Sequence, residues 1–264
     1  MAFNLASVSN QTRLRAPRIV LLGESKVGKS TLASQAESPI IIQIKNEEGL
    51  DDIPCARFPV CSTFQEVMQC ISSLYTDNHE YHTVVIDSAS ALEPLVWQSV
   101  CRRNGNVDSI EKAGGGYGKG FLFALDEWRQ LVEGLDALRS AREMASILIG
   151  HTRVRRYDDP LEGSYDRFEW DINTKAESFL FRWADAILFA AFKTVVRHEG
   201  VGFNKEVKRA IDITNGARYL YTQRRPGHPG GGRGIWGRLS YELPLSWPAL
   251  MDAVAAAQQR NAAQ

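Results

Sequence analysis

The sequence predicts an α/β fold in which a mostly parallel, twisted sheet carries helices on both faces. Short β-branched apolar runs alternate with helical patterns, as in strand–helix–strand units. A length of 264 residues is enough for one such domain with a sizeable buried core. A complete phosphate-binding loop also stands between the first apolar run and the first helical pattern, which is the strand–loop–helix context that this motif requires.

Short apolar runs mark the candidate strands, at residues 18–22, 39–44, 83–87, 145–150, 185–191 and 218–222. The run 83–87 is apolar until its final Asp87, which predicts a central strand buried on both faces. Between residues 121 and 142, apolar side chains recur every three or four positions and predict a helix of about five to six turns. We expect segment 209–222 to add a C-terminal β-ribbon that turns at residues 214–217.

Charge and cysteine content narrow the classes of protein. Lys+Arg and Asp+Glu each total 31, so a polyanion would have to bind through a local patch and not through the field of the whole chain. The cysteines show no C-x-x-C spacing and indicate reduced thiols in a cytoplasmic protein, not a disulfide framework or a zinc site. No apolar run approaches the roughly 18–20 residues of a membrane span, and no signal-peptide core is present.

The phosphate-binding loop has the complete pattern G-x-x-x-x-G-K-S. Its glycines let backbone N–H groups face a phosphate, and the helix expected over 31–37 adds the positive end of its dipole. Lys29 is expected to reach the β- and γ-phosphates, and the Ser30 hydroxyl to ligate Mg²⁺. The predicted cofactors are therefore ATP and Mg²⁺. The predicted binding residues are Gly23, Glu24, Ser25, Lys26, Val27, Gly28, Lys29, Ser30 and Thr31.

Polar residues at the ends of other predicted strands supply the remaining chemistry. Asp87 is expected to support the metal, although an isolated Asp at such a place is more often a helix cap or a turn residue. Hydrolysis also needs a group that orients and deprotonates the attacking water. Glu47 is the candidate base and Glu48 the alternative, unless their acidic turn is solvated surface. His151 ends the run 146–150, where it is either a γ-phosphate sensor or an ordinary loop residue.

Further blocks accompany these motifs, namely Val84-Val85-Ile86-Asp87-Ser88, Gly150-His151-Thr152-Arg153-Val154, Trp183-Ala184-Asp185-Ala186-Ile187-Leu188-Phe189 and Arg218-Tyr219-Leu220-Tyr221-Thr222. Together with the phosphate loop and the acidic turn, they resemble the phage-encoded RecA-like ATPases that act as single-strand annealing proteins in phage recombination. The resemblance covers residues 17–250. The usual Thr-Glu-Asp-Gly run of that family is Asn46-Glu47-Glu48-Gly49 here, which leaves open which glutamate activates water.

The resemblance implies a RecA-like P-loop core in which the strand before the phosphate loop and the Asp87 strand are separated by the His151 strand. It assigns the activation of water to Glu47 and nucleotide sensing to His151. It also implies two DNA-facing loops, at residues 102–120 and 152–172. We accordingly expect a leader over 1–16, the RecA-like ATPase domain over 17–250, and a helix end and tail over 251–264.

Single-stranded nucleic acid is held by cations on its backbone and by aromatic rings under its bases. In the two implied loops, the residues expected to contact DNA are Arg102, Arg103, Lys112, Tyr117, Lys119, Arg153, Arg155 and Arg156. The densest cationic stretch is 218–238, which has five arginines, interleaved aromatic residues and no acid. Its Arg224 and Arg225 either contact DNA or stabilise the γ-phosphate bound to a neighbouring subunit, unless these arginines are solvated surface.

The sequence therefore predicts a Mg²⁺-dependent ATPase that binds single-stranded DNA and promotes annealing or homologous recombination. Its expected partners are single-stranded DNA, further copies of the chain in a ring or filament, and a single-strand-binding protein. A helicase-like or packaging motor shares the core motifs, and a nucleotide-gated regulator of a protein partner is a third alternative. A nucleotide kinase fits least, because it would need an acceptor site and a mobile lid.

Overall fold

The computed structural model describes residues 8, 15–47, 49–160, 163–200, 206–212 and 215–262. Most of the predicted leader over 1–16, and Glu48, lie outside the described residues. The strands are β1 (Arg18–Gly23), β2 (Pro39–Gln43), β3 (Ala56–Arg57), β4 (Thr83–Asp87), β5 (Ala145–Asp159), β6 (Gly163–Trp170), β7 (Ala186–Phe192), β8 (Thr194–Gly200), β9 (Glu206–Asp212), β10 (Arg218–Tyr221), β11 (Gly231–Gly232) and β12 (Glu242–Pro244). The helices are α1 (Lys29–Ala33), α2 (Phe64–Thr76), α3 (Ala89–Arg103), α4 (Lys119–Ala141), α5 (Thr174–Trp183) and α6 (Trp247–Ala262), with the short 3₁₀ helices η2 (Ile110–Gly115) and η3 (Gly234–Arg238).

The main sheet has the strand order β12-β10-β7-β1-β5-β4-β2-β3. β1 lies between β5 and β7 and is parallel to both, and β5 also pairs in parallel with β4. The strand that carries His151 thus separates the strand before the phosphate loop from the Asp87 strand, as the resemblance implies. The antiparallel strands β10 and β12 complete the sheet beyond β7. The predicted fold class, a mostly parallel RecA-like sheet, is confirmed.

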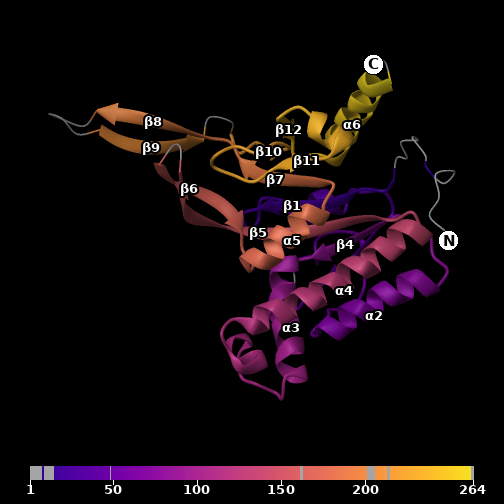
Figure 1. Cartoon of the computed structure of the whole chain (residues 1–264). Coiled ribbons are helices and arrows are strands. Elements are labelled where there is room, and N and C mark those ends of the chain that lie inside the picture. Colours follow the sequence, from indigo (N-terminus) through magenta and orange to yellow (C-terminus); the bar gives the residue numbers. More distant parts are fainter. Residues whose placement is uncertain are drawn as a thin grey trace.

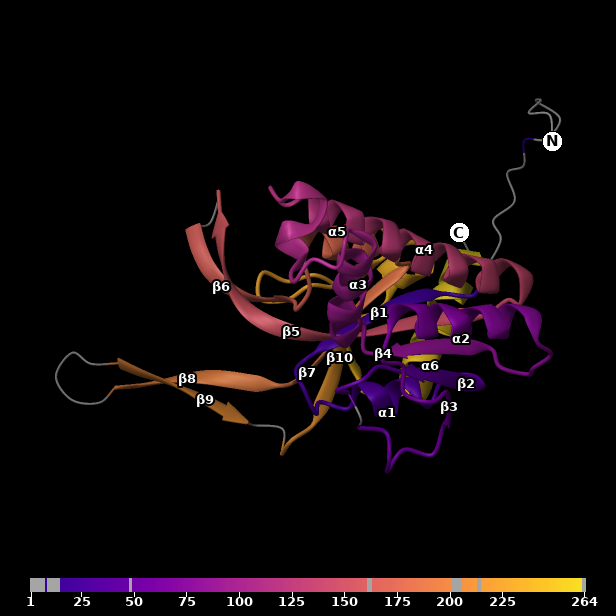
Figure 2. The ribbon, with the colours of Figure 1, turned by 90° about the horizontal axis from the view of Figure 1, so that it is seen from below.

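The core consists of two layers, one on each face of this sheet (Figure 1). Along β1, Val20 and Leu22 pack toward α2, α3, α4 and α5, whereas Ile19 and Leu21 pack toward α1 and α6. This alternation follows from the two-residue period of a strand. All of β4 is buried, as expected for a strand covered on both faces. Figure 2 shows α2, α3 and α4 together on one side of the sheet.

The predicted elements differ from the structure in few places. The helix expected over 31–37 is the shorter α1, and the chain then turns before Pro39, which disfavours a helical conformation in the residue that precedes it. The expected tail begins inside α6, whose Leu250, Val254 and Ala257 are buried in the core. No helix among the described residues combines the length and the apolar character that crossing a membrane would take.

The C-terminal ribbon is present, but its pairing differs from the prediction. β9 pairs with β8, and not with the strand that follows it. Asn215 and Gly216 form a turn as expected, yet β10 pairs with β7 and β12. The physical reason is burial: pairing between β7 and β12 places Leu220 in the core with no exposed surface.

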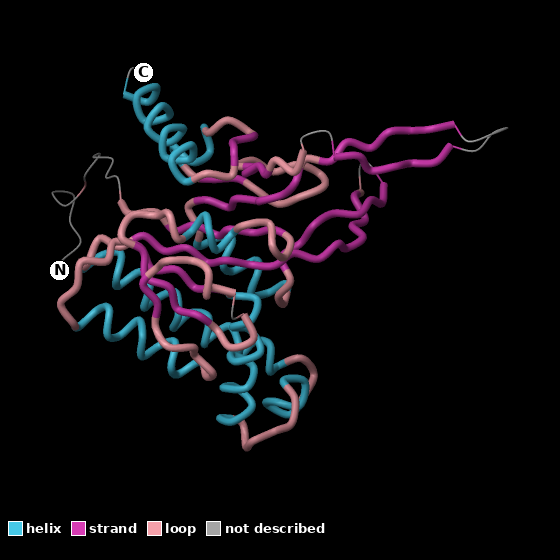
Figure 3. Tube along the Cα trace, turned by 180° about the vertical axis from the view of Figure 1, so that it is seen from behind, coloured by secondary structure: helices cyan, strands magenta, loops and turns pink. Residues whose placement is uncertain are grey.

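β5 continues beyond the sheet and forms a hairpin with β6, from the pair Thr152–Trp170 to the pair Asp159–Gly163. We call this hairpin the arm. The implied loop over 152–172 is therefore a regular antiparallel pair of strands. Gly150 allows Trp170, at the base of the arm, to pack closely against the sheet. A Cβ at position 150 would lie 2.3 Å from Trp170 Nε1 and 2.7 Å from Leu22 Cδ2. The arm and the β8–β9 ribbon project from the same end of the molecule (Figure 3).

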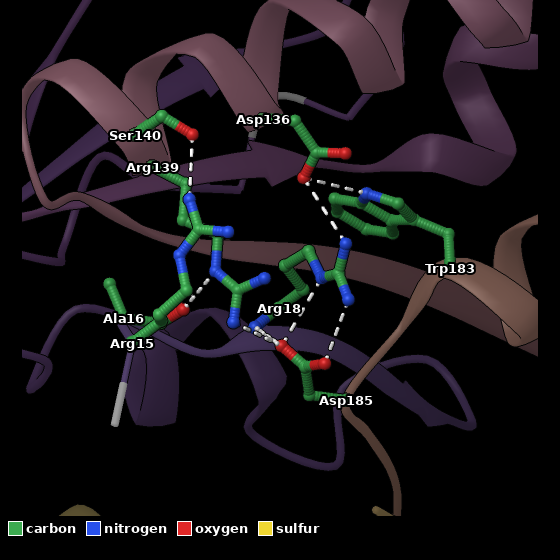
Figure 4. Close-up of polar contacts among 8 residues, drawn as sticks. All are labelled: Arg15, Ala16, Arg18, Asp136, Arg139, Ser140, Trp183 and Asp185. Atoms are coloured by element: carbon green, nitrogen blue, oxygen red, sulfur yellow. Dashed lines mark hydrogen bonds and ion pairs between the residues drawn. The ribbon is translucent and has the colours of Figure 1, made fainter. Parts of the chain in front are cut away.

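An ion-pair cluster holds the start of β1, at the end of the strand away from the phosphate-binding loop (Figure 4). The Asp185 carboxylate accepts hydrogen bonds from Arg18 Nη2 at 2.8 Å and from Arg139 Nη2 at 3.0 Å. Asp136 accepts from Arg18 Nη1 at 3.3 Å and from Trp183 Nε1 at 3.1 Å. These contacts join β1, α4 and the end of α5. The block that contains Trp183 and Asp185 thus has a structural role in this chain.

Candidate nucleotide site

The phosphate-binding loop connects β1 directly to α1. Gly28 caps this helix with φ 104°, a conformation that L side chains rarely adopt. A Cβ at Gly28 would also lie 2.7 Å from Arg218 Nη1. The second glycine of the motif is therefore required both by the local backbone and by a side chain from β10, two strands away from β1 in the sheet.

Lys29 lies at the centre of the loop and is 5% exposed. Its Nζ donates hydrogen bonds to the carbonyl oxygens of Gly23 at 2.9 Å and Glu24 at 2.7 Å. Burial lowers the pKa of Lys29 to about 8, although the nearby carboxylates of Asp87 and Glu47 oppose this shift. A bound phosphate would restore the electrostatic stabilisation that the ammonium has lost from water.

Asp87 ends β4 and is 4% exposed. Burial raises the pKa of Asp87, whereas its hydrogen bond with the Ser30 side chain opposes the increase. A hydroxyl and a carboxylate in contact are the hard oxygen donors that Mg²⁺ prefers, and this ion usually takes only one or two carboxylates in addition to substrate phosphates. The described residues contain no cluster of three or more acids, histidines and cysteines suited to a metal. The Ser30–Asp87 pair therefore fits a Mg²⁺ held jointly with a nucleotide.

Glu47 and His151 meet beside this pair. His151 Nε2 lies 2.8 Å from Glu47 Oε1, and the Ser88 hydroxyl donates to the same oxygen at 3.4 Å. The other ring nitrogen, Nδ1, lies 3.2 Å from Ser25 Oγ and 3.5 Å from Lys29 Nζ. The hydrogen bond from His151 lowers the pKa of Glu47. This favours the ionised form of Glu47, which its predicted role as a base requires.

These groups line one cleft of about 780 Å³, a size that holds small-molecule ligands and cofactors. We call it the nucleotide cleft. The predicted residues around it are Ser25, Lys26, Gly28, Lys29, Ser30, Thr31, Glu47, Asp87 and His151. Sequence reasoning missed other members of the lining. Arg218, at the start of β10, enters the cleft and donates to the Val27 carbonyl at 3.3 Å. The sequence places Arg218 in a cationic stretch and in one of the blocks that carry the resemblance, without assigning it to the cleft.

Ser90 is a second residue that the sequence did not single out. Its Oγ accepts hydrogen bonds from the backbone N–H of His151 at 3.0 Å and from Trp170 Nε1 at 3.1 Å. Ser90 therefore connects the predicted sensor to Trp170 at the base of the arm. Thr152, also at the base of the arm, and Asp171, which follows β6, line the cleft as well.

The loop expected over 102–120 holds its predicted DNA contacts in two different ways. Arg103 pairs with the buried Glu127, and Lys112 pairs with Asp108. Arg102, Tyr117 and Lys119 are exposed, and Tyr117 is exposed completely. These last three side chains are available to a ligand, and their role stays a prediction.

The arm carries the other predicted DNA contacts. Arg153 Nη1 lies 2.9 Å from Asp171 Oδ1, and Arg155 Nη1 lies 3.6 Å from Glu169 Oε2. Arg156 is exposed and stands opposite Asp166 in the hairpin register. The Arg153–Asp171 pair is exposed on both sides and contributes little to stability, so a phosphate can displace its carboxylate at low cost. Glu169 is buried and also pairs with Arg167, so it is less easily displaced from Arg155.

Arg224 and Arg225 do not line the nucleotide cleft of their own chain. They line a second pocket, of about 440 Å³, and the Arg225 guanidinium carbon lies 4.3 Å from the centroid of the Tyr241 ring. A role for either arginine at a γ-phosphate would therefore require the nucleotide of a neighbouring subunit.

Comparison with known proteins places the chain in a family. The crystal structure of the RadB recombinase is similar to it, with 17% identity and a TM-score of 0.41, over 82% of this chain and 85% of that one. No curated protein matches the sequence. A family model described as an AAA domain matches residues 15–234, which is well over half of the chain. The chain therefore belongs to the AAA domain family.

Proposed function

We propose that the protein is a Mg²⁺-dependent ATPase that binds single-stranded DNA under nucleotide control and promotes annealing or homologous recombination. One observation carries the enzymatic part. Lys29, Ser30, Glu47, Asp87 and His151 come from separate segments and converge in a single cleft. Structural ion pairs explain isolated contacts of this kind, but not a phosphate loop that meets a metal pair and a base together.

The chemistry follows from these positions. Lys29 would exchange its two carbonyl partners for phosphate oxygens, and Ser30 and Asp87 would hold the metal. A bound Mg²⁺ would supply neutralisation of charge on the phosphate oxygens. Glu47 takes a proton from water as the water oxygen attacks the γ-phosphorus, and the bond from that phosphorus to the β,γ-bridging oxygen breaks to give ADP and phosphate.

His151 is proposed to report the presence of the γ-phosphate. In this structure its Nε2 is occupied by Glu47. A γ-phosphate that accepts a hydrogen bond from His151 would release the Glu47 carboxylate for the attacking water. Hydrolysis would then start only when the triphosphate is in place.

The arm provides the proposed route from nucleotide to DNA. Thr152 and Asp171 at its base line the nucleotide cleft, and Asp171 pairs with Arg153. The charge of a bound triphosphate therefore acts directly on the ion pair that anchors the arm. Annealing of complementary strands runs downhill, so we propose that ATP controls the grip on DNA and the assembly of subunits.

The resemblance supports the remaining parts of the proposal. They are a phage origin, action in the cytoplasm of the host, a ring or filament of identical subunits, and cooperation with a single-strand-binding protein.

The test is the binding of a fluorescein-labelled oligothymidylate, measured by anisotropy with and without Mg²⁺ and a non-hydrolysable ATP analogue. We expect tight DNA binding only with the analogue, and the logarithm of the affinity should fall linearly with the logarithm of salt concentration. In Lys29→Ala the analogue should have no effect on DNA binding. An absence of DNA binding in every nucleotide state would contradict the proposal and favour a regulator directed at a protein.

A further inference from the structure

The second pocket opens where β6, α5 and the turn after β10 meet. Its cationic lining consists of Arg167, Arg182, Arg224 and Arg225, and its aromatic lining includes Phe168, Phe181 and His228. We call it the arginine pocket. It shares no lining residue with the nucleotide cleft, so it is a separate pocket.

The charge of the arginine pocket is not balanced internally. Its two carboxylates are already engaged, because Glu169 pairs with Arg167 at 2.6 Å and Glu177 accepts the backbone N–H of Trp170 at 3.3 Å. Arg182 and Arg224 are exposed, and within the part of the chain that the structure describes neither pairs with a carboxylate. The pocket therefore presents free guanidinium groups to an anion.

The turn that carries Arg224 is held in place before any ligand binds. Arg225 and His228 exchange backbone hydrogen bonds of 3.2 Å in both directions across the turn. The Gly227 carbonyl accepts the backbone N–H of Phe168 at 2.8 Å, which fastens the turn to β6. Little ordering entropy remains to be lost when a ligand binds here.

Aromatic rings form the wall beside these cations. Phe181 is half-buried and stacks on Trp170, with ring centroids 5.7 Å apart and planes 24° apart. Phe168 is also half-buried, and the centroid of its ring lies 5.2 Å from that of Phe189. Exposed parts of such rings are platforms on which a nucleobase stacks, whereas a short acidic peptide has no equivalent flat partner.

We propose that the arginine pocket binds one nucleotide unit of single-stranded nucleic acid, with its base against Phe181 and its backbone phosphates on Arg182 and Arg224. This inference rests on the proposed function and gives the DNA a specific site on this chain. It also assigns Arg224 to nucleic acid and not to the γ-phosphate of a neighbour.

The same pocket is connected to the nucleotide cleft through Trp170. The indole stacks on Phe181 on one side and donates to Ser90, which in turn accepts the N–H of His151. A base that stacks on Phe181 therefore contacts the ring that packs on Trp170, and Trp170 is hydrogen-bonded to the Ser90 hydroxyl that accepts the His151 N–H. Nucleic acid in the pocket and triphosphate in the cleft are expected to strengthen each other's binding, because such coupling is reciprocal.

The first test compares Arg182→Ala/Arg224→Ala with the control Arg129→Ala/Arg260→Ala, which removes two exposed arginines outside the pocket. With oligothymidylate, Mg²⁺ and the ATP analogue, we expect the pocket variant to bind at least tenfold more weakly. The slope of log affinity against log salt should fall by roughly 1.4, which corresponds to two lost phosphate contacts. Phe181→Leu should weaken binding and leave the slope unchanged.

Each other outcome would overturn the inference. Binding by the pocket variant within twofold of its control would exclude these arginines from the DNA path. Normal DNA binding with lost ATP hydrolysis would instead make them groups that act on a neighbour's nucleotide. If the wild-type chain binds no DNA in any nucleotide state, the proposed function itself fails, which distinguishes that result from failure of the pocket alone.

A second test locates the base directly. An oligonucleotide containing 5-iododeoxyuridine is photo-crosslinked to the wild-type chain, which is then digested with trypsin. We expect adducts in the peptides 168–175 and 176–182, which contain Phe168 and Phe181. Adducts confined to the peptide 113–119, which contains Tyr117, would place the bases on the loop before α4 and contradict the inference.

Discussion

The nucleotide cleft and the arginine pocket hold their charges in opposite ways. In the cleft, Lys29 and Asp87 are each at most 5% exposed, and both already have hydrogen-bond partners. In the pocket, Arg182 and Arg224 are exposed and have no carboxylate partner among the described residues. Removing a buried charge that has partners costs several kcal/mol, whereas each exposed cation contributes only a small amount to stability or binding. Substitutions in the two regions should therefore differ in size and kind.

The largest effect is expected from Glu47→Gln. Removal of the base should lower the hydrolysis rate by about 10²–10⁴-fold and leave nucleotide binding nearly intact, because the amide keeps the shape of the side chain. Phosphate release and the binding of a fluorescent ATP analogue measure the two quantities. Glu48→Gln is the matched control, and a reversed pattern between the two variants would move the base to Glu48.

A smaller effect is expected from Ser90→Ala, which cuts the link between Trp170 and the sensor. Stimulation of hydrolysis by single-stranded DNA should fall by about 5-fold or more, the lower range of typical coupling. The gain in DNA affinity from bound nucleotide should fall with it, whereas DNA affinity without nucleotide should stay unchanged. Steady-state rates with and without DNA give the stimulation. Ser99→Ala removes a hydroxyl from the same helix that contacts Glu127 and should leave the stimulation intact. Equal stimulation in both variants would disconnect the pocket from the cleft.

The lowered pKa of Lys29 predicts that nucleotide affinity depends on pH. In the free protein the ammonium loses its proton above a pKa of about 8, and a bound phosphate raises this pKa again. Nucleotide affinity should therefore be constant with respect to this group below pH 8 and fall by up to about tenfold per pH unit above it. Titration of affinity against pH measures this. In Lys29→Ala, binding should be weak and this dependence absent, and an unchanged slope there would assign the effect to another group.

The smallest effect distinguishes two neighbouring arginines in the last turn of α3. Arg103→Ala leaves the Glu127 carboxylate with only its Ser99 contact and should lower the free energy of unfolding by about 1 kcal/mol. Arg102→Ala should leave stability unchanged, because no buried partner depends on it. Urea unfolding of both variants decides this, and equal stabilities would show that the pair with Glu127 is not structural.

The convergence of most predicted site residues in one cleft could be expected from the sequence for a physical reason. The phosphate loop is contiguous, and Asp87 and His151 each follow an apolar run whose parallel pairing brings the strand ends to one edge of the sheet. Arg218 and Ser90 escape such reasoning, because their roles depend on the packing of β10 against β7 and on the fold of Trp170 over Gly150. The pairing of the ribbon escapes it for the same reason, since a local turn signal does not reveal that Leu220 is buried between β7 and β12.

The rate of ATP hydrolysis with and without single-stranded DNA tests the central claim most directly, with Lys29→Ala measured in parallel. The account predicts Mg²⁺-dependent hydrolysis that rises when single-stranded DNA is added and disappears in the variant. Hydrolysis that is indifferent to DNA would contradict the proposed link between the nucleotide cleft and nucleic acid, and hydrolysis that survives in Lys29→Ala would contradict the assignment of the cleft itself.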